Sequence, residues 1–334
     1  MSNKTILITG ATGSLGAYLV RYYSRSGFKV IAHGRDKVPP THLMDFAEYV
    51  SFDLTNDFEL PQCDFCIHTA ALSDDKASIG DLLPANEQGT KRLLEKLLPE
   101  TVFIHISSSS VYLPQKNPIS EEIAGKQNNK ELSPYGLSKL KSEEVILNNT
   151  KNKSVFILRP RAFYGAGDRV ILPRILKVVK KGKPWFLQRP GEMNVSVSLT
   201  HYSTLAHAID CCLQSDLSGI HIYNVADKKV YVLIDIVRLI TTRLYGYKLP
   251  EKKVPIWFMK ALSVFKIGGI TPLLVRSFTH DMVLNTTKIE REMGFNPTIC
   301  FEDQMEELAN WVKKNGGVEF VKTGDRSLAW TADL

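Results

Sequence analysis

Tyr135 and Lys139 occupy positions i and i+4 of the segment YGLSK, a spacing that places two side chains on one face of a helix. A free tyrosine has a pKa of about 10, and a neighbouring ammonium favours the phenolate. We therefore expect Lys139 to draw the pKa of Tyr135 toward neutrality and to make the phenol a general acid and base. On spacing alone, a solvated surface pair is the default interpretation.

A run of serines, 107–110, follows an apolar segment that ends at Ile106. Ligands of parallel sheets bind at the carboxyl ends of the strands. A serine hydroxyl at this place can donate a hydrogen bond to a substrate carbonyl while Tyr135 exchanges the proton. For any single serine, a polar loop that needs small residues is the alternative.

A glycine-rich turn, TGATGSLG at 9–16, directly follows the first strand-like segment. Gly10 permits a tight turn, Gly13 lets the backbone approach a phosphate, and Gly16 allows a helix to pack closely on the strand. The N–H groups that begin the helix attract an anion. The position of the turn between a strand and a helix predicts a site for the pyrophosphate of a dinucleotide.

The end of the second strand usually distinguishes NAD from NADP, because an acidic residue there holds the ribose 2′-hydroxyl. The segment VIAHGR at 30–35 has no carboxylate, and Arg35 follows the strand at once. This pattern favours NADP over NAD. In the alternative interpretation Arg35 is solvated, and His33 or Asp36 serves the ribose. Asp53, after the third strand, is a candidate for the adenine end.

Short apolar segments alternate with helical patterns through the first half of the chain. The strand-like segments are 5–9, 28–32, 49–52, 65–69, 102–107 and 154–158, and the helical ones are 15–25, 86–98 and 134–147. Ser133 is a candidate N-cap, with Pro134 at the first helical position. Alternation of this kind predicts an α/β fold with a doubly wound parallel sheet.

The alternation weakens after about Gly165, where proline and glycine become frequent. We divide the chain into a nucleotide-binding domain, 1–165, and a smaller C-terminal substrate-binding region, 166–334, with part of 195–225 returning to the first domain. The apolar segment 254–275 reads as one or two helices, because two lysines and a Gly-Gly break argue against a membrane span. Contact of this basic, apolar segment with a membrane is the less favoured alternative. A final amphipathic helix is expected over 301–314.

Composition excludes several classes of protein. Of 334 residues, 44% are hydrophobic and 23% are charged, as in globular proteins, and the net charge of +7 is too diffuse to indicate nucleic-acid binding. The scattered histidines show no ligand spacing, so we expect no metal. Five cysteines are too few for a disulfide framework and indicate a reducing, cytoplasmic location. They are Cys63, Cys66, Cys211, Cys212 and Cys300.

Taken together, these segments resemble the extended short-chain dehydrogenase/reductase superfamily, the NAD-dependent epimerase/dehydratase family. The matching stretches are TGATGSLG at 9–16, HTAA at 68–71, NEQGT at 86–90, SSSSVY at 107–112, YGLSK at 135–139 and LRPRAFYGAGD at 158–168. The resemblance implies a Rossmann fold, a nicotinamide cofactor, a small-molecule substrate and a homodimer.

The resemblance also implies roles for single residues. Tyr135 would be the acid/base, Lys139 would bind the nicotinamide ribose and lower the pKa of the tyrosine, and Ser108 would be the catalytic serine, three residues before Val111. The implied cofactor contacts are Gly10, Thr12, Gly13, Ser14, Leu15, Gly16, Arg35, Asp53, Leu54, Thr69, Ala70, Ala71, Asn86, Tyr135, Lys139, Pro160 and Arg161.

Two departures bear on the substrate. Nucleotide-sugar epimerases of the family carry an asparagine where this chain has Ala162, and two charges that the matching stretch 197–202 lacks. The pattern is closer to the 3β-hydroxysteroid dehydrogenase-like branch, which interconverts ketones and secondary alcohols on bulky, often apolar substrates. A nucleotide-sugar epimerase, dehydratase or reductase with the same triad is the alternative. The basic run 174–189 reads as a solvated helix face, or as a site for an anionic substrate.

Overall fold

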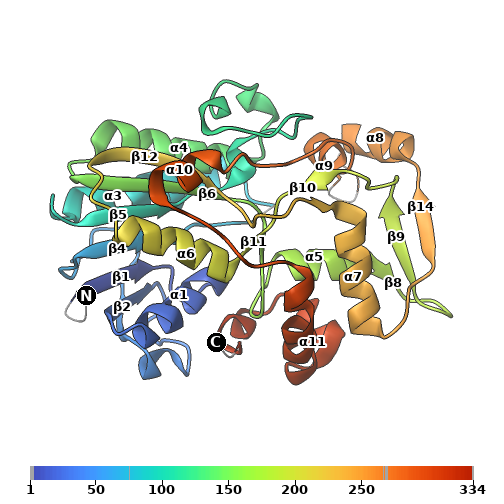
Figure 1. Cartoon of the computed structure of the whole chain (residues 1–334), viewed down its shortest axis with the longest axis horizontal. Helices are drawn as coiled ribbons and strands as arrows, with labels where there is room; N and C mark the ends of the chain where they lie inside the picture. Colours follow the sequence, from blue (N-terminus) through green and yellow to red (C-terminus); the bar gives the residue numbers. More distant parts are fainter. Residues whose placement is uncertain (1–3, 75, 266, 268–269, 333–334) are drawn as a thin grey trace.

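The computed structural model describes residues 4–332 except 75, 266 and 268–269. Its centre is a seven-stranded sheet in which every neighbouring pair is parallel, in the order β12-β6-β5-β4-β1-β2-β3 (Figure 1). The order reverses between β1 and β4, as in a doubly wound sheet, so the predicted α/β fold is confirmed. The strands are β1 (Thr5–Thr9), β2 (Lys29–Gly34), β3 (Glu48–Ser51), β4 (Phe65–His68), β5 (Val102–Ile106), β6 (Ser154–Pro160) and β12 (Gly219–Val225).

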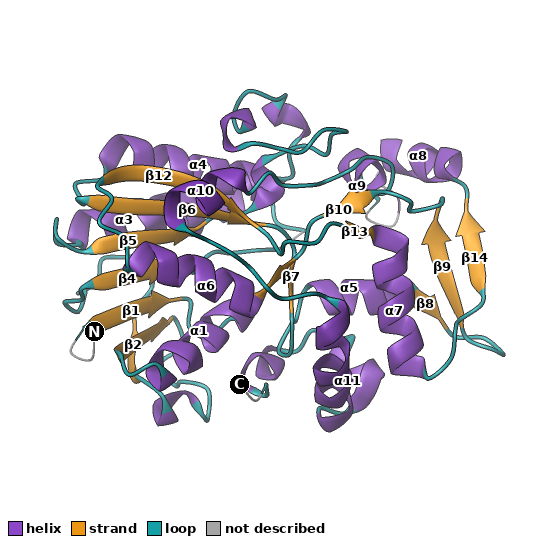
Figure 2. Ribbon diagram, in the orientation of Figure 1, coloured by secondary structure: helices purple, strands orange, loops and turns teal. Residues whose placement is uncertain are grey.

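Helices cover both faces of this sheet (Figure 2). Successive side chains of a strand point to opposite faces. Ile6 and Ile8 accordingly pack in one buried cluster with α1 and α6, whereas Leu7 packs in another with α3 and α4. The helices are α1 (Ser14–Arg25), α2 (Ile79–Leu83), a π-helical turn (Pro84–Gln88), α3 (Gly89–Lys96), α4 (Pro134–Asn149) and α6 (Tyr202–Leu213).

The edge strand β12 comes from the second half of the chain. It pairs with β6 along its whole length, with Tyr223 opposite Leu158. Residues 202–225 therefore contribute a helix and a strand to the nucleotide-binding architecture, although the chain has already passed through α5 and the short strands before it.

The remaining elements form a second part beside the carboxyl ends of the central strands. Its small sheets are β14-β9-β8, β10-β13 and β11-β7, and the predicted helices over 254–275 and 301–314 are present as α8, α9 and α11. The elements of this part are β7 (Phe163–Tyr164), α5 (Ile171–Lys177), β8 (Val179–Lys180), β9 (Phe186–Pro190), β10 (Ser196–Val197), β11 (Thr200–His201), β13 (Tyr231–Val232), α7 (Leu233–Tyr245), β14 (Glu251–Val254), α8 (Ile256–Val264), α9 (Pro272–Ser277), α11 (Met305–Lys314) and α12 (Gly317–Val321). The exception among the remaining elements is α10 (Thr287–Met293), which packs on β12 of the central sheet (Figure 1).

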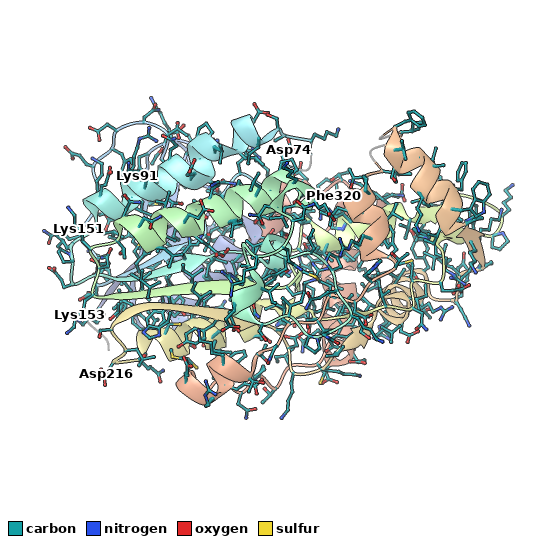
Figure 3. All side chains as sticks on the ribbon, turned by 90° about the horizontal axis from the view of Figure 1, so that it is seen from above. Asp74, Lys91, Lys151, Lys153, Asp216 and Phe320 are labelled. Atoms are coloured by element: carbon teal, nitrogen blue, oxygen red, sulfur yellow. The ribbon has the colours of Figure 1, made fainter. Side chains whose placement is uncertain are left out.

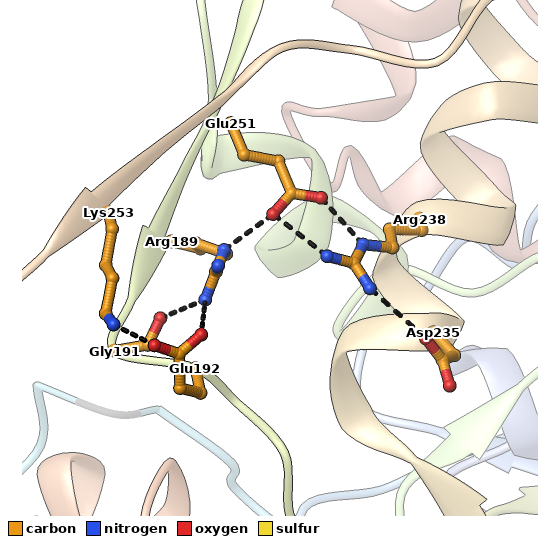
Figure 4. A network of polar contacts seen from close by, with 7 residues as sticks. All are labelled: Arg189, Gly191, Glu192, Asp235, Arg238, Glu251 and Lys253. Carbon is orange, nitrogen blue, oxygen red and sulfur yellow. Dashed lines mark hydrogen bonds and ion pairs between the residues drawn. The ribbon is translucent and has the colours of Figure 1, made fainter.

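A polar network joins β9, β14 and α7 in this part (Figure 4). The Glu251 carboxylate accepts one hydrogen bond of 2.6 Å from Arg189 Nε and another of 2.6 Å from Arg238 Nε. Arg189, the last residue of the basic run, is thus bound to Glu251 and joins β9 to β14. The interpretation of 174–189 as one helix face is wrong, because α5 ends at Lys177 and two short strands follow.

Seen from above, the two parts lie side by side, with Lys91, Lys151 and Asp216 at the outer margin of the sheet part (Figure 3). None of the helices in the described ranges is long and apolar enough to cross a membrane.

Candidate active site

The glycine turn after β1 is shaped by two close approaches of backbone. Gly10 has φ +71°, and a Cβ there would lie 2.7 Å from the Cα of Ala70. A Cβ on Gly16 would lie 2.2 Å from the carbonyl oxygen of Gly10. Both positions therefore exclude any other residue without movement of backbone, as the sequence predicted for a tight turn and for close packing.

The start of α1 offers backbone donors to an anion. Gly13 is the N-cap and makes no side-chain capping bond, and the first N–H groups of a helix have no partner within it. Ser14, Leu15 and Gly16 form this first turn, and Thr12 stands beside Gly34 at the end of β2. The absence of a side chain at Gly13 and these donors fit the pyrophosphate of a dinucleotide.

The residues after β2 differ in their availability. The ring of His33 is buried, stacks on Phe52 at 3.8 Å between centroids, and lies with Nε2 2.9 Å from the carbonyl of Phe52. Burial lowers the pKa of His33 to about 4. His33 is therefore held in the core. Arg35 is exposed, and the carboxylate of Asp36 lies 3.9 Å from Arg326.

Other predicted cofactor contacts lie at the ends of neighbouring strands. The Asp53 carboxylate accepts two hydrogen bonds of 2.9 Å from the backbone and side chain of Thr55, and the backbone bond lowers the pKa of Asp53. Leu54 is buried in the core. Thr69 Oγ1 donates a 2.6 Å hydrogen bond to the carbonyl of Thr9, which fixes the exit of β4 against that of β1.

Asn86 ties the loop after β4 to helix α4. Its Oδ1 accepts a 2.7 Å hydrogen bond from the N–H of Leu72, and its Nδ2 donates a 2.8 Å bond to Ser138 Oγ. The loop that it holds contains residues 70–71. Asn86 thus positions the backbone near the proposed cofactor and aligns it with the helix that carries Tyr135.

The three predicted catalytic side chains meet at the carboxyl end of β5. Ser133 caps α4 by accepting a 3.0 Å hydrogen bond from Gly136, so that Tyr135 stands in the first turn. The Ser108 hydroxyl lies near Tyr135, whose pKa it lowers, and donates a 3.0 Å hydrogen bond to Ser110 Oγ. One turn further, Lys139 Nζ donates a 2.7 Å hydrogen bond to the carbonyl of Ile106.

The pKa values of this group correct one expectation. Burial raises the pKa of Tyr135 to about 12, while the nearby Ser108 hydroxyl and the positive charge of Arg174 oppose the rise. Burial also lowers the pKa of Lys139 to about 8, against the opposing charge of Glu143. The predicted shift of Tyr135 toward neutrality is wrong here, because desolvation outweighs the charges and the Lys139 ammonium is bonded to a backbone carbonyl.

Two arginines lie near each other at this site, and the charge of one of them, Arg174, acts on the phenol. Arg161 follows the end of β6 at Pro160, and its N–H donates a 3.0 Å hydrogen bond to Thr200 Oγ1. Its Nε is buried without a hydrogen-bond partner among the described residues. Burial, together with the nearby charge of Arg174, lowers the pKa of Arg161 to about 10. Sequence reasoning included Arg174 only as a member of the basic run.

A buried ion pair behind the site was not predicted. Arg159 Nη2 lies 2.6 Å from Glu143 Oε2, and both side chains are almost fully buried, with 4% and 2% exposure. Arg159 Nη1 also donates 2.7 Å bonds to Tyr112 Oη and to the carbonyl of Glu121, while Ser107 donates to the Glu143 carboxylate. The sequence did contain one indication of this pair, because Glu143 stands one helical turn after Lys139 on α4.

The comparisons with known proteins agree with this architecture. The model of the NAD dependent epimerase/dehydratase family matches residues 6–226. The chain belongs to that family, whose members include epimerases, dehydratases and dehydrogenases, and it is an oxidoreductase-type enzyme.

Relatives of several activities align with almost the whole chain. The uncharacterized protein YbjS of Escherichia coli is 27% identical, covering 93% of this chain and 98% of its own length. A UDP-glucose 4-epimerase of Vibrio cholerae is 26% identical over 92% and 94%. A decarboxylating sterol-4-alpha-carboxylate 3-dehydrogenase of Candida albicans is 22% identical over 94% and 99%.

The fold has close neighbours among solved structures. A UDP-glucuronic acid 4-epimerase from Bacillus cereus, crystallised in complex with NAD, superposes with a TM-score of 0.70 at 20% identity. The match covers 93% of this chain and 97% of the epimerase. At this level of identity the likeness establishes the extended short-chain dehydrogenase fold.

Proposed function

We propose that the enzyme interconverts a ketone and a secondary alcohol on a bulky small-molecule substrate, with Tyr135 as acid/base. The observation that carries this proposal is the proximity of the Ser108 hydroxyl to Tyr135, with Lys139 one turn further along the helix of Tyr135. These groups lie at the carboxyl end of β5, the edge at which the glycine turn also opens. Ligands of open parallel sheets bind at this edge.

A bound nicotinamide cofactor supplies the hydride for the ketone, or accepts it from the alcohol. The first turn of α1 would hold its pyrophosphate, and Lys139 would hold the nicotinamide ribose. Ser108 donates a hydrogen bond to the substrate oxygen and fixes the carbonyl beside the phenol. In reduction Tyr135 gives its proton to that oxygen, and in oxidation it takes the proton back. The pKa of about 12 keeps Tyr135 protonated and suits it to the donor role.

The choice between substrate classes is supported by residues at the end of β6. Ala162 offers no side-chain amide to a sugar nucleotide, and 197–202 carries no arginine for a diphosphate. Curated relatives include 3beta-hydroxysteroid-dehydrogenase/decarboxylases and a 2-alkyl-3-oxoalkanoate reductase. The charge of Arg174 near Tyr135, with Arg161 near Arg174, suits a substrate with an acidic group near the reacting carbon. The alternative, a nucleotide-sugar epimerase, is kept because such an enzyme aligns over 92% of the chain.

A ligand screen distinguishes the two functions. In the presence of NADPH, we expect bulky, mainly apolar ketones to raise the melting temperature of the protein, and those that also carry an acidic group to raise it most. A ligand that binds only the folded state stabilises that state. UDP-, GDP- and dTDP-sugars should leave the temperature unchanged. The thermal-shift measurement contradicts the proposal if a sugar nucleotide stabilises strongly and no ketone does.

We propose NADP as the preferred cofactor, and Arg35 as the residue that selects it. Arg35 is exposed at the end of β2, whereas His33 is buried and bonded to Phe52. Solved structures with a similar fold were crystallised with NAD. The proposal therefore concerns only whether this enzyme prefers the cofactor that carries a 2′-phosphate.

Replacing Arg35 by aspartate should weaken NADPH binding about 10- to 100-fold, because a charge-assisted bond to the phosphate is lost and a like charge is added. NADH binding should change little or improve. Lys37→Asp, at an exposed position two residues on, is the matched control and should have a small effect. Dissociation constants from fluorescence titration give the answer, and tighter binding of NADH by the unmodified enzyme would refute the assignment.

We also propose that the enzyme is a cytoplasmic homodimer. All five cysteines are free thiols in the structure, and burial raises the pKa of Cys66 and Cys212 well above the usual value. Inert, unpaired thiols accord with a reducing cytoplasm. A homodimer is expected from the family resemblance, and light scattering would test it.

A further inference from the structure

An apolar face stands out on the outer side of the C-terminal part. Six of its large apolar side chains are exposed, and they lie within the eighteen positions 257–274. Trp257 is 71% exposed, Val264 72% and Phe265 77%. The α8–α9 face consists of Trp257, Phe258, Val264, Phe265, Ile267 and Leu274.

Such a concentration is unusual for a surface in water. Single exposed apolar residues are normal, but contiguous apolar patches mark interaction sites. In α8 only Met259 and Ser263 are buried, so most of this helix faces away from the protein. The helix lies at the outer edge of the molecule with α9 beside it (Figure 1).

The chain segment that forms the face carries charges of one sign. Between Glu251 and Asp281 the chain contains no acidic residue but has five basic ones. Arg276 is paired with Glu131 and Lys253 with Glu192, whereas Lys252 and Lys260 are exposed at the margin. The basic residues are Lys252, Lys253, Lys260, Lys266 and Arg276.

We propose that the α8–α9 face docks the enzyme on an anionic lipid bilayer. Aromatic residues with lysines at their margin are the composition of helices that lie in the membrane interface. Helix α8 has nine residues, so it is about 14 Å long and cannot cross a hydrocarbon core of about 30 Å. It would lie in the plane of the headgroups. The proposal takes up the membrane contact that the sequence alone favours less.

Charge argues against a second copy of the chain on this face. In a two-fold symmetric dimer the same surface meets itself, and the lysines of both copies would be brought together without acidic partners from this segment. An anionic bilayer instead supplies charge of the opposite sign, worth more for every lysine that approaches it. The face thus fits a lipid surface better than a copy of itself.

The position of the face relative to Tyr135 suits a membrane-borne substrate, a point that rests on the proposed function. Arg276 of α9 lies 2.8 Å from Glu131, in the short turn directly before α4. Docking would bring the helix that carries Tyr135 near the lipid surface. The docking itself needs no catalysis, so Tyr135→Phe should bind vesicles like the unmodified enzyme even if the proposed reaction is wrong.

Co-sedimentation of the full chain with vesicles tests the proposal. We expect binding to phosphatidylcholine/phosphatidylglycerol vesicles at low salt, weaker binding at high salt, and little binding to phosphatidylcholine alone. Trp257→Ala with Phe265→Ala, and separately Lys260→Glu, should each weaken partitioning about tenfold or more. Val38→Ala with Leu147→Ala, which removes exposed apolar residues elsewhere, is the matched control and should bind normally.

Fluorescence gives a second readout. Trp257 is exposed, so its emission should shift to the blue with anionic vesicles. Trp257→Phe keeps an apolar ring and should still sediment, but without that shift. The proposal is overturned if the unmodified protein does not bind anionic vesicles at low salt, or if the Trp257/Phe265 variant binds as well as the control. It is equally overturned if that variant instead lowers the molecular mass in solution, since the face would then join two copies.

Discussion

Replacing Tyr135 by phenylalanine is expected to lower turnover about 10²- to 10⁴-fold, the usual contribution of a positioned general acid and base. The substitution keeps the aromatic ring in place and removes only the hydroxyl, which lies near Ser108. Because the phenol acts on the substrate oxygen, the dissociation constant of the cofactor should remain nearly unchanged. Steady-state kinetics with a ketone from the ligand screen, together with cofactor titration, measures both quantities.

Two further variants sharpen this result. Tyr247→Phe removes a hydroxyl from an exposed tyrosine that is not part of the candidate site, so it should leave turnover unaltered. Ser108→Ala should lower turnover less than Tyr135→Phe, because it removes a hydrogen bond to the substrate but leaves the proton donor. Turnover of Tyr135→Phe within tenfold of the unmodified enzyme would show that the phenol has no chemical role.

Replacing Arg159 by methionine is expected to destabilise the fold by about 3–5 kcal/mol, because it leaves the buried Glu143 carboxylate without its partner. Arg159 makes two bonds of 2.6 and 2.9 Å with Glu143, and further bonds to Tyr112 and to the carbonyl of Glu121. The loss should also reach the active site, since Glu143 stands one turn after Lys139 and raises its pKa.

The exposed pair Lys141–Glu144 is the matched control on the same helix. Its atoms are also 2.6 Å apart, but the side chains are 42% and 45% exposed, so Lys141→Met should cost at most about 1 kcal/mol. Adding Glu143→Gln to Arg159→Met should restore part of the stability, because a neutral amide is less costly to bury than a carboxylate. Urea denaturation measures all of these variants, and equal losses for Arg159→Met and Lys141→Met would refute the account.

Much of the fold was predictable because its signals are local. The strand 5–9, the cap at Ser133 and the glycine turn depend on residues within a few positions, and the structure contains them as β1, the α4 cap and the Gly10–Gly16 bend. The small sheets of the second part were not predicted. Their strands, such as β10 with two residues, are too short to show a period, and β9 pairs with a segment more than sixty positions away.

The candidate site likewise has features that the sequence predicted and features that depend on the tertiary fold. The sequence predicted that Tyr135 and Lys139 share one helix face, because they are four residues apart. It also predicted that Ser108 lies near Tyr135, because Ser108 follows a parallel strand at the edge where ligands bind. The cation that acts on Tyr135 is Arg174, from α5, and only the tertiary fold brings it there. The direction of the Tyr135 pKa depends on burial, which a pattern of residue types does not measure.

The central claim is that Ser108 and Tyr135 hold a substrate carbonyl for hydride transfer, and the most direct measurement is a single turnover with NADPH that carries deuterium at the transferred position. The account predicts that the alcohol product contains one deuterium on the former carbonyl carbon, and that Tyr135→Phe forms this product far more slowly. An alcohol without deuterium, or the same rate in both enzymes, would contradict it.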